Sequence, residues 1–499
     1  MTLSQKPFPE FLKDFEKTLA HLFHDHADIN KLSLVRGLPA DILSGIMAKN
    51  PLSVAIPSDF GGRGSIVKEC LGILSAASYE SLSLSLTFGI NIALFLEPVS
   101  KYADEAVKKE IFDRFLKEAN MGGLMITEPN YGSDALNMKT ANRETENGYQ
   151  IKGQKHWQGL TGMADYWLIA SRKELANGEL ARDIDFFICD ISKDKQKIVV
   201  EELFDNPGLY LIPYGLNTVD IEVPKNYRLQ PESTGIKMML DILHRSRLQF
   251  PGMGMGFIKR MLDEAIKQCT NRIVGTSNLL ALDGVQFQLA RIQTAFTIAS
   301  AMCAKSSKIS GIAYDLATEG IQANTMKAVV TDLMQESAQL LVQLSGASGY
   351  KTTHIGGRGI MDSRPFQIFE GSNEMLYAQI ADMVLRMMKK QKQTSFFDFL
   401  KDFGLTAESS THFKKDLSFS INGSLSQRKL VDLGKIIARI VCVGYVIELE
   451  QNGFRKDLVN NCIVMVQQEV AGLMSAFHFE NTVNVIEDYN SNSLWMDFA

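Results

Sequence analysis

The chain has 499 residues, of which 45% are hydrophobic and 22% are charged, and its formal net charge is −5 with a pI of ≈ 6.0. This length predicts about three domains, and the composition excludes an intrinsically disordered or collagen-like chain. The slightly acidic balance does not favour binding to nucleic acid or to an anionic membrane.

Targeting and membrane signals are weak. The first fifteen residues mix acidic and basic side chains and have no apolar core, so we expect no signal or transit peptide. The apolar run Ile436–Ile447 is interrupted by Arg439 and is too short to cross a bilayer, so no transmembrane segment is expected. The six cysteines are scattered, with no C-x-x-C pair, which predicts reduced thiols and a cytoplasmic protein.

Residues 1–122 are predicted to form a helical domain. Lys101–Asn120 places its apolar residues near one helical face, and Ser75–Leu96 is an apolar run typical of one or two buried helices. Between residues 123 and 236 the pattern changes to short apolar runs separated by turn residues. Strands are predicted over 166–170, 185–189 and 197–200, so this segment reads as a compact β domain.

Helical periodicity returns in residues 237–392. Helices are predicted over 236–272, 285–319, 324–344 and 380–392, with an interruption of the first at Pro251 and a glycine-rich loop over 346–364. The glycines of Gly252–Gly256 follow no strand, which favours close helix packing over a dinucleotide-binding loop. Residues 393–499 form an extra segment with two further helices, over 427–451 and 459–479.

Common catalytic patterns are missing from the sequence. His21, His24 and His26 are best explained as a solvated helix end, so we predict no metal site. There is no H-E-x-x-H motif and no G-x-S-x-G motif. The turns at Gly132-Ser133-Asp134 and Gly371-Ser372-Asn373 could cradle phosphate, although each alone is more often a plain turn or helix cap.

Four motifs occur in a specific order: Thr127-Glu-Pro-Asn-Tyr-Gly-Ser-Asp134, Gly153-Gln-Lys-His-Trp157, Gln343-Leu-Ser-Gly-Ala-Ser-Gly-Tyr350 and Phe366-Gln-Ile-Phe-Glu-Gly-Ser-Asn373. With these motifs, residues 10–390 resemble the acyl-CoA dehydrogenase flavoprotein family. The resemblance implies a mostly α fold with a middle β-barrel domain (α+β, multidomain). The expected units are an N-terminal helical domain (1–122), the β-barrel (123–236), a C-terminal helical bundle (237–392) and an additional helical extension (393–499).

The resemblance also implies a reaction. Glu370 lies where a large branch of the family has its catalytic base, which abstracts the α-proton of a fatty acyl thioester while the β-hydride passes to flavin N5. Desolvation by Phe366 and Phe369 would raise the pKa of that carboxyl toward working pH. The Glu370 backbone N–H would donate to the thioester oxygen.

Further roles follow from the same resemblance. It implies FAD as cofactor, bound by Ile126, Thr127, Gly132, Ser133, Trp157, Ser372 and, in a neighbouring subunit, by Arg272 and Gln343. It implies substrate contacts for Arg247, Phe369 and Gly371. Some family members carry the base one residue before this Arg, where the present chain has Ser246, a residue that cannot serve as one.

The chain departs from the family pattern at three positions. Gly159 stands where a Thr hydroxyl is usual near the flavin, Gly275 replaces a Phe, and Asp283 aligns with a Gln. These changes bear on flavin binding and reactivity and leave Glu370 in register.

Three functions remain open from the sequence. The first is an FAD-dependent acyl-CoA dehydrogenase that makes a trans-2-enoyl thioester and passes electrons to an electron-transferring flavoprotein. The second is an acyl-CoA oxidase or a dehydrogenase acting on acyl carrier protein in a biosynthetic pathway. The third is a non-catalytic flavoprotein interaction module. A homodimer or homotetramer is expected, and the extension is expected to pack on the core or on a partner subunit rather than on a membrane.

Overall fold

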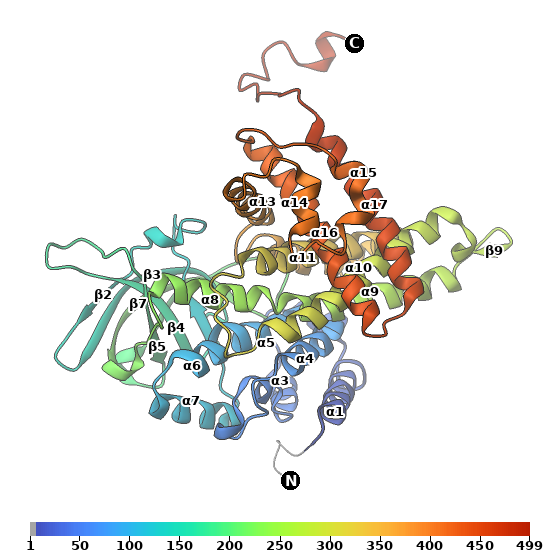
Figure 1. The fold of residues 1–499 in the computed structure, drawn as a ribbon. Helices are drawn as coiled ribbons and strands as arrows, with labels where there is room; N and C mark the ends of the chain where they lie inside the picture. The colour runs from blue at the N-terminus through green and yellow to red at the C-terminus, as the bar shows by residue number, and fades with distance from the viewer. Residues whose placement is uncertain (1–5) are drawn as a thin grey trace.

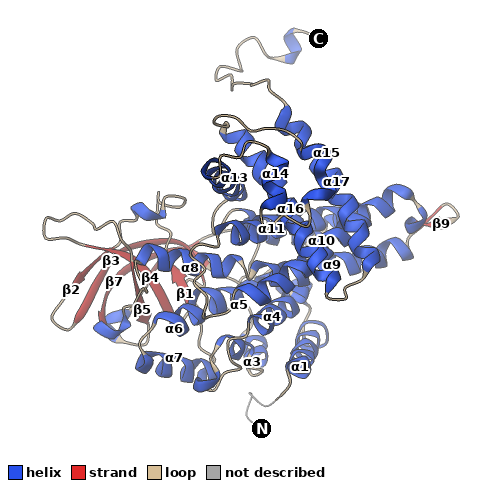
Figure 2. Cartoon of the chain, viewed as in Figure 1, coloured by secondary structure: helices blue, strands red, loops and turns tan. Residues whose placement is uncertain are grey.

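The computed structural model of the chain describes residues 6–499 and shows helices, then a sheet, then helices again (Figure 1, Figure 2). Residues 1–5, part of the N-terminal segment for which no targeting peptide is expected, lie outside the described residues. The predicted mostly helical fold with a middle β domain is confirmed.

The N-terminal part is helical. Its α-helices are α1 (Phe8–Ala20), α2 (Ile29–Leu32), α3 (Ala40–Met47), α4 (Val67–Glu80), α5 (Leu82–Asn91), α6 (Glu97–Tyr102) and α7 (Glu105–Glu118). Three of these helices begin at a side-chain cap: Asp28 Oδ1 accepts the N–H of Asn30 at 2.9 Å, Ser81 Oγ accepts that of Leu84 at 3.3 Å, and Asp104 Oδ1 accepts that of Ala106 at 2.9 Å. The predicted run 75–96 is the end of α4, all of α5 and a π-helical segment, Ile92–Leu96.

One helical run in the described residues, Leu82–Tyr102, has the length and hydropathy of a membrane span. However, 94% of its most apolar window is buried inside the structure, which is typical of a core helix in a globular fold.

The middle of the chain forms a seven-stranded, curled sheet in the order β1-β4-β2-β3-β7-β6, with β5 paired to β4. Its strands are β1 (Gly122–Met125), β2 (Ala141–Glu144), β3 (Gly148–Gly159), β4 (Tyr166–Lys173), β5 (Asp185–Asp190), β6 (Val199–Leu203) and β7 (Tyr214–Pro224). The three predicted strands correspond to β4, β5 and β6. The long antiparallel pair β3–β7 was not predicted, because β3 is mostly polar and acquires its strand character from pairing with β7.

The C-terminal bundle comprises α8 (Gly235–Arg247), α9 (Phe250–Asn271), α10 (Asp283–Ile309), α11 (Gly320–Ser345), α12 (Ile355–Ser363) and α13 (Asn373–Lys390). A hairpin of β8 (Ile273–Val274) and β9 (Ser277–Asn278) joins α9 to α10 and lies at the end of the molecule opposite the sheet (Figure 1). The expected interruption at Pro251 is confirmed, since α8 ends and α9 begins immediately before it.

The close-packing interpretation of the glycine cluster is also confirmed. A Cβ on Gly254 would stand 2.3 Å from Val330 Cγ2, and one on Gly256 would stand 1.9 Å from the backbone oxygen of Ser75. These glycines therefore let α9 approach α11 and α4.

Two predictions about the bundle were wrong. The helix expected over 285–319 ends at Ile309, because side chains of α8 bind the backbone carbonyls that would continue it: Arg245 donates to Ser310 and Tyr314, and the ring of His244 hydrogen-bonds Leu316. The glycine-rich segment 346–364 is not all loop.

That segment contains α12. The side chain of His354 caps its N-terminus by accepting the N–H of Gly356. A Cβ on Gly359 would stand 3.1 Å from the ring of Phe257, so this glycine serves close packing between helices rather than loop flexibility.

The extension comprises α14 (Phe396–Asp402), α15 (Lys414–Leu417), α16 (Gln427–Gln451) and α17 (Lys456–His478). α16 packs against α13 and α10, and α17 packs against α16 and α10. Of the two alternatives predicted for the extension, packing on the core or on a partner subunit, the first is confirmed for α16 and α17.

Candidate active site

Glu370 and Gly371 form a left-handed turn just before α13. Their φ angles are 53° and 94°, and both are unfavourable for residues other than glycine. A Cβ on Gly371 would stand 2.9 Å from Met375 Cε and 3.0 Å from Leu376 Cδ2. Only glycine fits at 371, while the surrounding contacts hold Glu370 in its strained conformation.

Two buried cations hold the successive carbonyls of this turn. Arg247, on α8, donates from Nε (3.1 Å) and Nη2 (2.8 Å) to the backbone oxygen of Glu370. Lys327, on α11, donates from Nζ to the backbone oxygen of Gly371 at 2.7 Å. The Arg247 side chain, predicted to contact substrate, is itself buried and also donates to Asn324 Oδ1 at 2.8 Å. In the structure, Arg247 therefore anchors the turn.

The Glu370 carboxylate is bonded on one side only. Ser246 Oγ donates to its Oε1 at 2.8 Å, whereas Oε2 is buried and has no partner among the described residues. The two positions that the resemblance assigns to a base, 246 and 370, are therefore side by side in this chain.

Burial raises the pKa of the Glu370 carboxyl, while the Ser246 hydrogen bond and the charges of Arg247 and Lys327 oppose that rise. An aromatic cluster directly precedes Glu370 in the chain: the ring centroids of Phe366 and Phe369 lie 4.9 Å apart, and Phe250 packs against both. The expected rise in the pKa of Glu370 by desolvation is found, and Phe366 and Phe369 stay its predicted source.

The backbone N–H of Glu370 makes no hydrogen bond within residues 6–499. It is therefore available to an external acceptor beside the carboxylate. A group that accepts this N–H and presents an acidic C–H to Oε2 would meet the requirements for proton abstraction.

Lys327 lies beside this turn but was missed from the sequence, and Asn373 was noted there only as part of a turn that could cradle phosphate. Lys327 is fully buried, and burial lowers its pKa to about 7, although the charge of Glu370 opposes this. Asn373 Oδ1 accepts from Lys327 Nζ at 2.9 Å. A signal was present, because Lys327 is the one charged residue in the otherwise uncharged segment 320–331.

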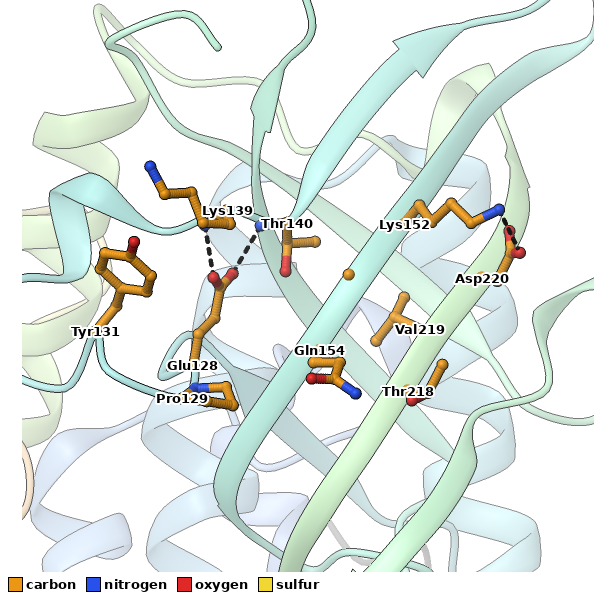
Figure 3. A pocket seen from close by; sticks show the side chains of 11 residues that line it. Glu128, Pro129, Tyr131, Lys139, Thr140, Lys152, Gln154, Thr218, Val219 and Asp220 are labelled. Carbon is orange, nitrogen blue, oxygen red and sulfur yellow. Dashed lines mark hydrogen bonds and ion pairs between the residues drawn. The ribbon is translucent and has the colours of Figure 1, made fainter. Parts of the chain in front are cut away.

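The Thr127–Asp134 motif follows β1, and a side chain of β3 holds it in place. Lys155 is fully buried and donates from Nζ to Glu128 Oε1 and to the backbone oxygen of Ile126, both at 3.0 Å. Glu128 also accepts the N–H groups of Lys139 and Thr140, as Figure 3 shows. Thr127 is thus fixed between two anchored neighbours.

An open pocket of about 380 Å³ lies beside this motif and is lined by Glu128, Pro129, Tyr131, β3 and β7 (Figure 3). Its charged side chains are mixed in sign, and Lys152 pairs with Asp220 at 2.9 Å. Gly132 and Ser133, predicted to contact phosphate, lie in the exposed turn that follows.

Trp157 is displayed on the surface of the sheet. Its φ is 64°, at a bulge in the β3–β7 pairing, and half of the residue is exposed. The centroid of its ring lies 4.5 Å from that of Phe204, so Phe204 holds the indole in place while part of it stays accessible. It is not a core residue of the sheet.

Arg272 and Gln343 lie at the other end of the molecule. Arg272 is the C-cap of α9 beside the β8–β9 hairpin, and its Nη1 is 3.3 Å from where a Cβ on Gly346 would stand, three residues beyond Gln343. Both are exposed. All the predicted cofactor residues except Ser372 therefore fall into two groups, one at the sheet and one beside the hairpin, and these two elements lie at opposite ends of the molecule (Figure 1).

The sheet group fits a flavin dinucleotide: it offers an accessible indole, an exposed Gly-Ser turn and an anchored Thr127 segment. Ser372 lies at the N-cap of α13 and makes no side-chain cap bond there. No three His, Cys, Asp or Glu residues cluster for a metal in the part of the chain that the structure describes. His21, His24 and His26 instead hydrogen-bond to three different carboxylates.

Comparison with known proteins agrees with this layout. Residues 123–217 match the family model for the acyl-CoA dehydrogenase middle domain, and residues 233–385 match that for the acyl-CoA dehydrogenase C-terminal domain. The chain is 23% identical to the mouse (Mus musculus) mitochondrial very long-chain specific acyl-CoA dehydrogenase over 74% of its length, and it spans 57% of that relative. It is 23% identical to the short-chain specific acyl-CoA dehydrogenase of Megasphaera elsdenii over 77% of its length, and it spans 99% of that relative.

A solved structure from Bacillus anthracis, an acyl-CoA dehydrogenase complexed with FAD, covers 97% of this chain, and the alignment spans 91% of that structure. Its TM-score is 0.76 at 18% identity. The likeness therefore includes most of the extension beyond residue 393. On the two family models and these relatives, the chain belongs to the acyl-CoA dehydrogenase family.

Proposed function

We propose that the protein is an FAD-dependent oxidoreductase that converts an acyl thioester to its trans-2-enoyl thioester, with Glu370 as the base. The observation that carries this proposal is the second carboxylate oxygen of Glu370, which is buried and unpartnered beside a free backbone N–H. Membership of the family supports the reaction class.

The residues of this chain support the following chemistry. The thioester oxygen would accept the Glu370 N–H, which stabilises the negative charge that develops when the α-proton leaves. Glu370 Oε2 would take that proton. The electron pair of the broken α-carbon–hydrogen bond would then form the new double bond as a hydride leaves the β-carbon. FAD, when bound, would supply the two-electron acceptor for this hydride.

The apolar surroundings of Glu370 serve the proton transfer. A carboxylate with an ordinary pKa would be a weak base at neutral pH, and burial brings its proton affinity closer to what the α-carbon requires. Ser246 fixes Oε1, so that Oε2 is the oxygen left to react.

For the cofactor we propose Ile126, Thr127, Gly132, Ser133, Trp157 and Ser372 from one chain, with Arg272 and Gln343 from a second copy. The separation of these two groups within one chain supports a homodimer or homotetramer. We propose an electron-transferring flavoprotein as acceptor and a cytoplasmic location, the latter on the scattered cysteines alone.

The test is anaerobic mixing of the FAD-loaded protein with acyl-CoAs of short, medium and long chain, and with the same acyl groups on acyl carrier protein. We expect one panel to bleach the absorption of oxidised flavin at about 450 nm. The product should be lighter by two hydrogen atoms. Hydrogen peroxide formed in air would identify an oxidase. A protein that holds FAD but is bleached by neither panel would contradict the proposal.

A further inference from the structure

The extension contains one deeply buried charge that the reaction itself does not require. Arg439, on α16, is 5% exposed. Its Nε donates to Glu469 Oε1 on α17 at 2.8 Å, and its Nη1 donates to the phenol oxygen of Tyr377 on α13 at 3.3 Å. A buried guanidinium is costly unless it is well paired, so these contacts call for an explanation.

The contact with Tyr377 continues toward α11. Tyr377 is fully buried and donates its single hydroxyl proton to Asp332 Oδ2 at 2.7 Å. Because the phenol oxygen accepts from Arg439 while its proton goes to Asp332, the direction of the hydrogen bonds is fixed. The other oxygen of Asp332 accepts the side-chain amide of Asn373 at 2.7 Å.

Asn373 connects this chain of bonds to the active-site turn. With its amide nitrogen facing Asp332, its Oδ1 faces Lys327, whose Nζ donates to it at 2.9 Å and to the backbone oxygen of Gly371 at 2.7 Å. Gly371 directly follows Glu370. A continuous series of hydrogen bonds therefore runs from Arg439 to the turn that carries the base.

Packing fixes the same two helices independently. A Cβ on Gly434 would stand 1.9 Å from the backbone oxygen of Tyr377, so α16 touches the backbone of α13 there. Lys435 Nζ also lies 5.9 Å from the centroid of the Tyr377 ring. The register of α16 against α13 therefore brings Arg439 to the tyrosine hydroxyl.

From these contacts we propose that Arg439 is a positioning residue for the active-site turn, acting through Tyr377, Asp332, Asn373 and Lys327. The extension would then help to hold the turn at residues 370–371 in place. The inference rests on the proposed function for its kinetic consequences, but its structural claim, that α16 immobilises residues 370–371, is independent of the reaction.

Two variants test it in the full-length protein. Arg439→Gln removes the charge, and Tyr377→Phe removes the hydroxyl while the ring still packs against α16. Arg439→Lys keeps a cation and should restore part of the effect. Arg428→Gln is the matched control, because Arg428 lies on the same helix with a 46% exposed side chain and contacts only the extension.

The first measurement is hydrogen–deuterium exchange of segment 366–376, which needs no substrate. We expect about tenfold or faster exchange in Arg439→Gln and Tyr377→Phe than in the control. The second measurement is the rate of flavin bleaching, taken over a range of substrate concentrations and across a pH series. We expect kcat to fall roughly tenfold or more with little change in KM. The acid limb should move to higher pH, because a displaced Lys327 no longer favours the charged form of Glu370.

Exchange and pH profiles that match those of Arg428→Gln in both variants would overturn the inference. So would failure of Arg439→Lys to recover any part of the exchange protection. If the unaltered protein is not bleached by any acyl thioester, the proposed function fails, and the exchange measurement still decides the structural claim.

Discussion

The Glu370 carboxylate is held by one hydrogen bond from Ser246, and its other oxygen is left without a partner. Ser246 is therefore the residue that stabilises one side of the carboxylate. Its hydroxyl stabilises the charged form of Glu370 and so limits how far burial raises the pKa of the carboxyl.

Ser246→Ala should therefore raise the pKa of Glu370 further. Because the base reacts only when deprotonated, activity is lost as pH falls through that pKa, and the acid limb of the bleaching rate should move to higher pH. Rapid mixing across a pH series measures it, with Ser246→Thr as the control that keeps a hydroxyl. An unchanged acid limb in Ser246→Ala would mean that the bond does not influence the base.

Gly371→Ala should unfold more easily than the unaltered protein by about 1–3 kcal/mol, because alanine is strained at a φ of 94° and meets Met375 and Leu376. The matched control is Gly472→Ala on α17, where a Cβ meets nothing within 4 Å. That change should stabilise the helix by about 0.5–1 kcal/mol. Thermal unfolding compares the two, and equal effects would contradict the assigned backbone strain.

Among the elements, β3 anchors the segment Thr127–Asp134, for which we propose cofactor contacts, through the buried pair Lys155–Glu128. Glu128→Gln leaves Lys155 buried without its counter-charge, which should cost about 3–5 kcal/mol in unfolding free energy. Asp220→Asn breaks the exposed pair with Lys152 and should cost at most about 1 kcal/mol. Chemical denaturation distinguishes them, and a Glu128→Gln protein as stable as Asp220→Asn would refute this role of β3.

The elements also show what the sequence can predict. The helix α16 was predicted at its observed bounds and α17 to within three residues, because the apolar periodicity of a long helix is local. β3 was not, because its partner β7 lies far along the chain and supplies the pairing. α12 was missed because its glycines were read as loop residues, whereas their meaning depends on Phe257 and other distant side chains.

The active site divides in the same way. Glu370 was predicted as the base from a motif in register, and Phe366 and Phe369 belong to the same motif. Lys327, Asn373 and the contact of Ser246 with Glu370 come from three different helices or their ends, so only the tertiary structure brings them together.

At the scale of the whole molecule, the proposed cofactor residues on the sheet lie far from those at the hairpin, Arg272 and Gln343, and we propose that a second copy completes the site. Arg272→Glu should therefore weaken FAD binding, measured by flavin fluorescence during titration, without loss of thermal stability. Lys267→Glu, the same charge change at an exposed position of α9, is the control. Equal FAD affinity in the two variants would contradict the shared site. So would a protein that is monomeric by light scattering and still binds FAD fully.

The central claim is that Glu370 removes the substrate proton. Its most direct test is rapid anaerobic mixing of FAD-loaded Glu370→Gln with the acyl thioester that bleaches the unaltered protein, beside Glu374→Gln as an exposed control on the first turn of α13. We predict that Glu370→Gln binds FAD normally but is not bleached, while Glu374→Gln is bleached at the unaltered rate. Bleaching of Glu370→Gln at that rate would contradict the account.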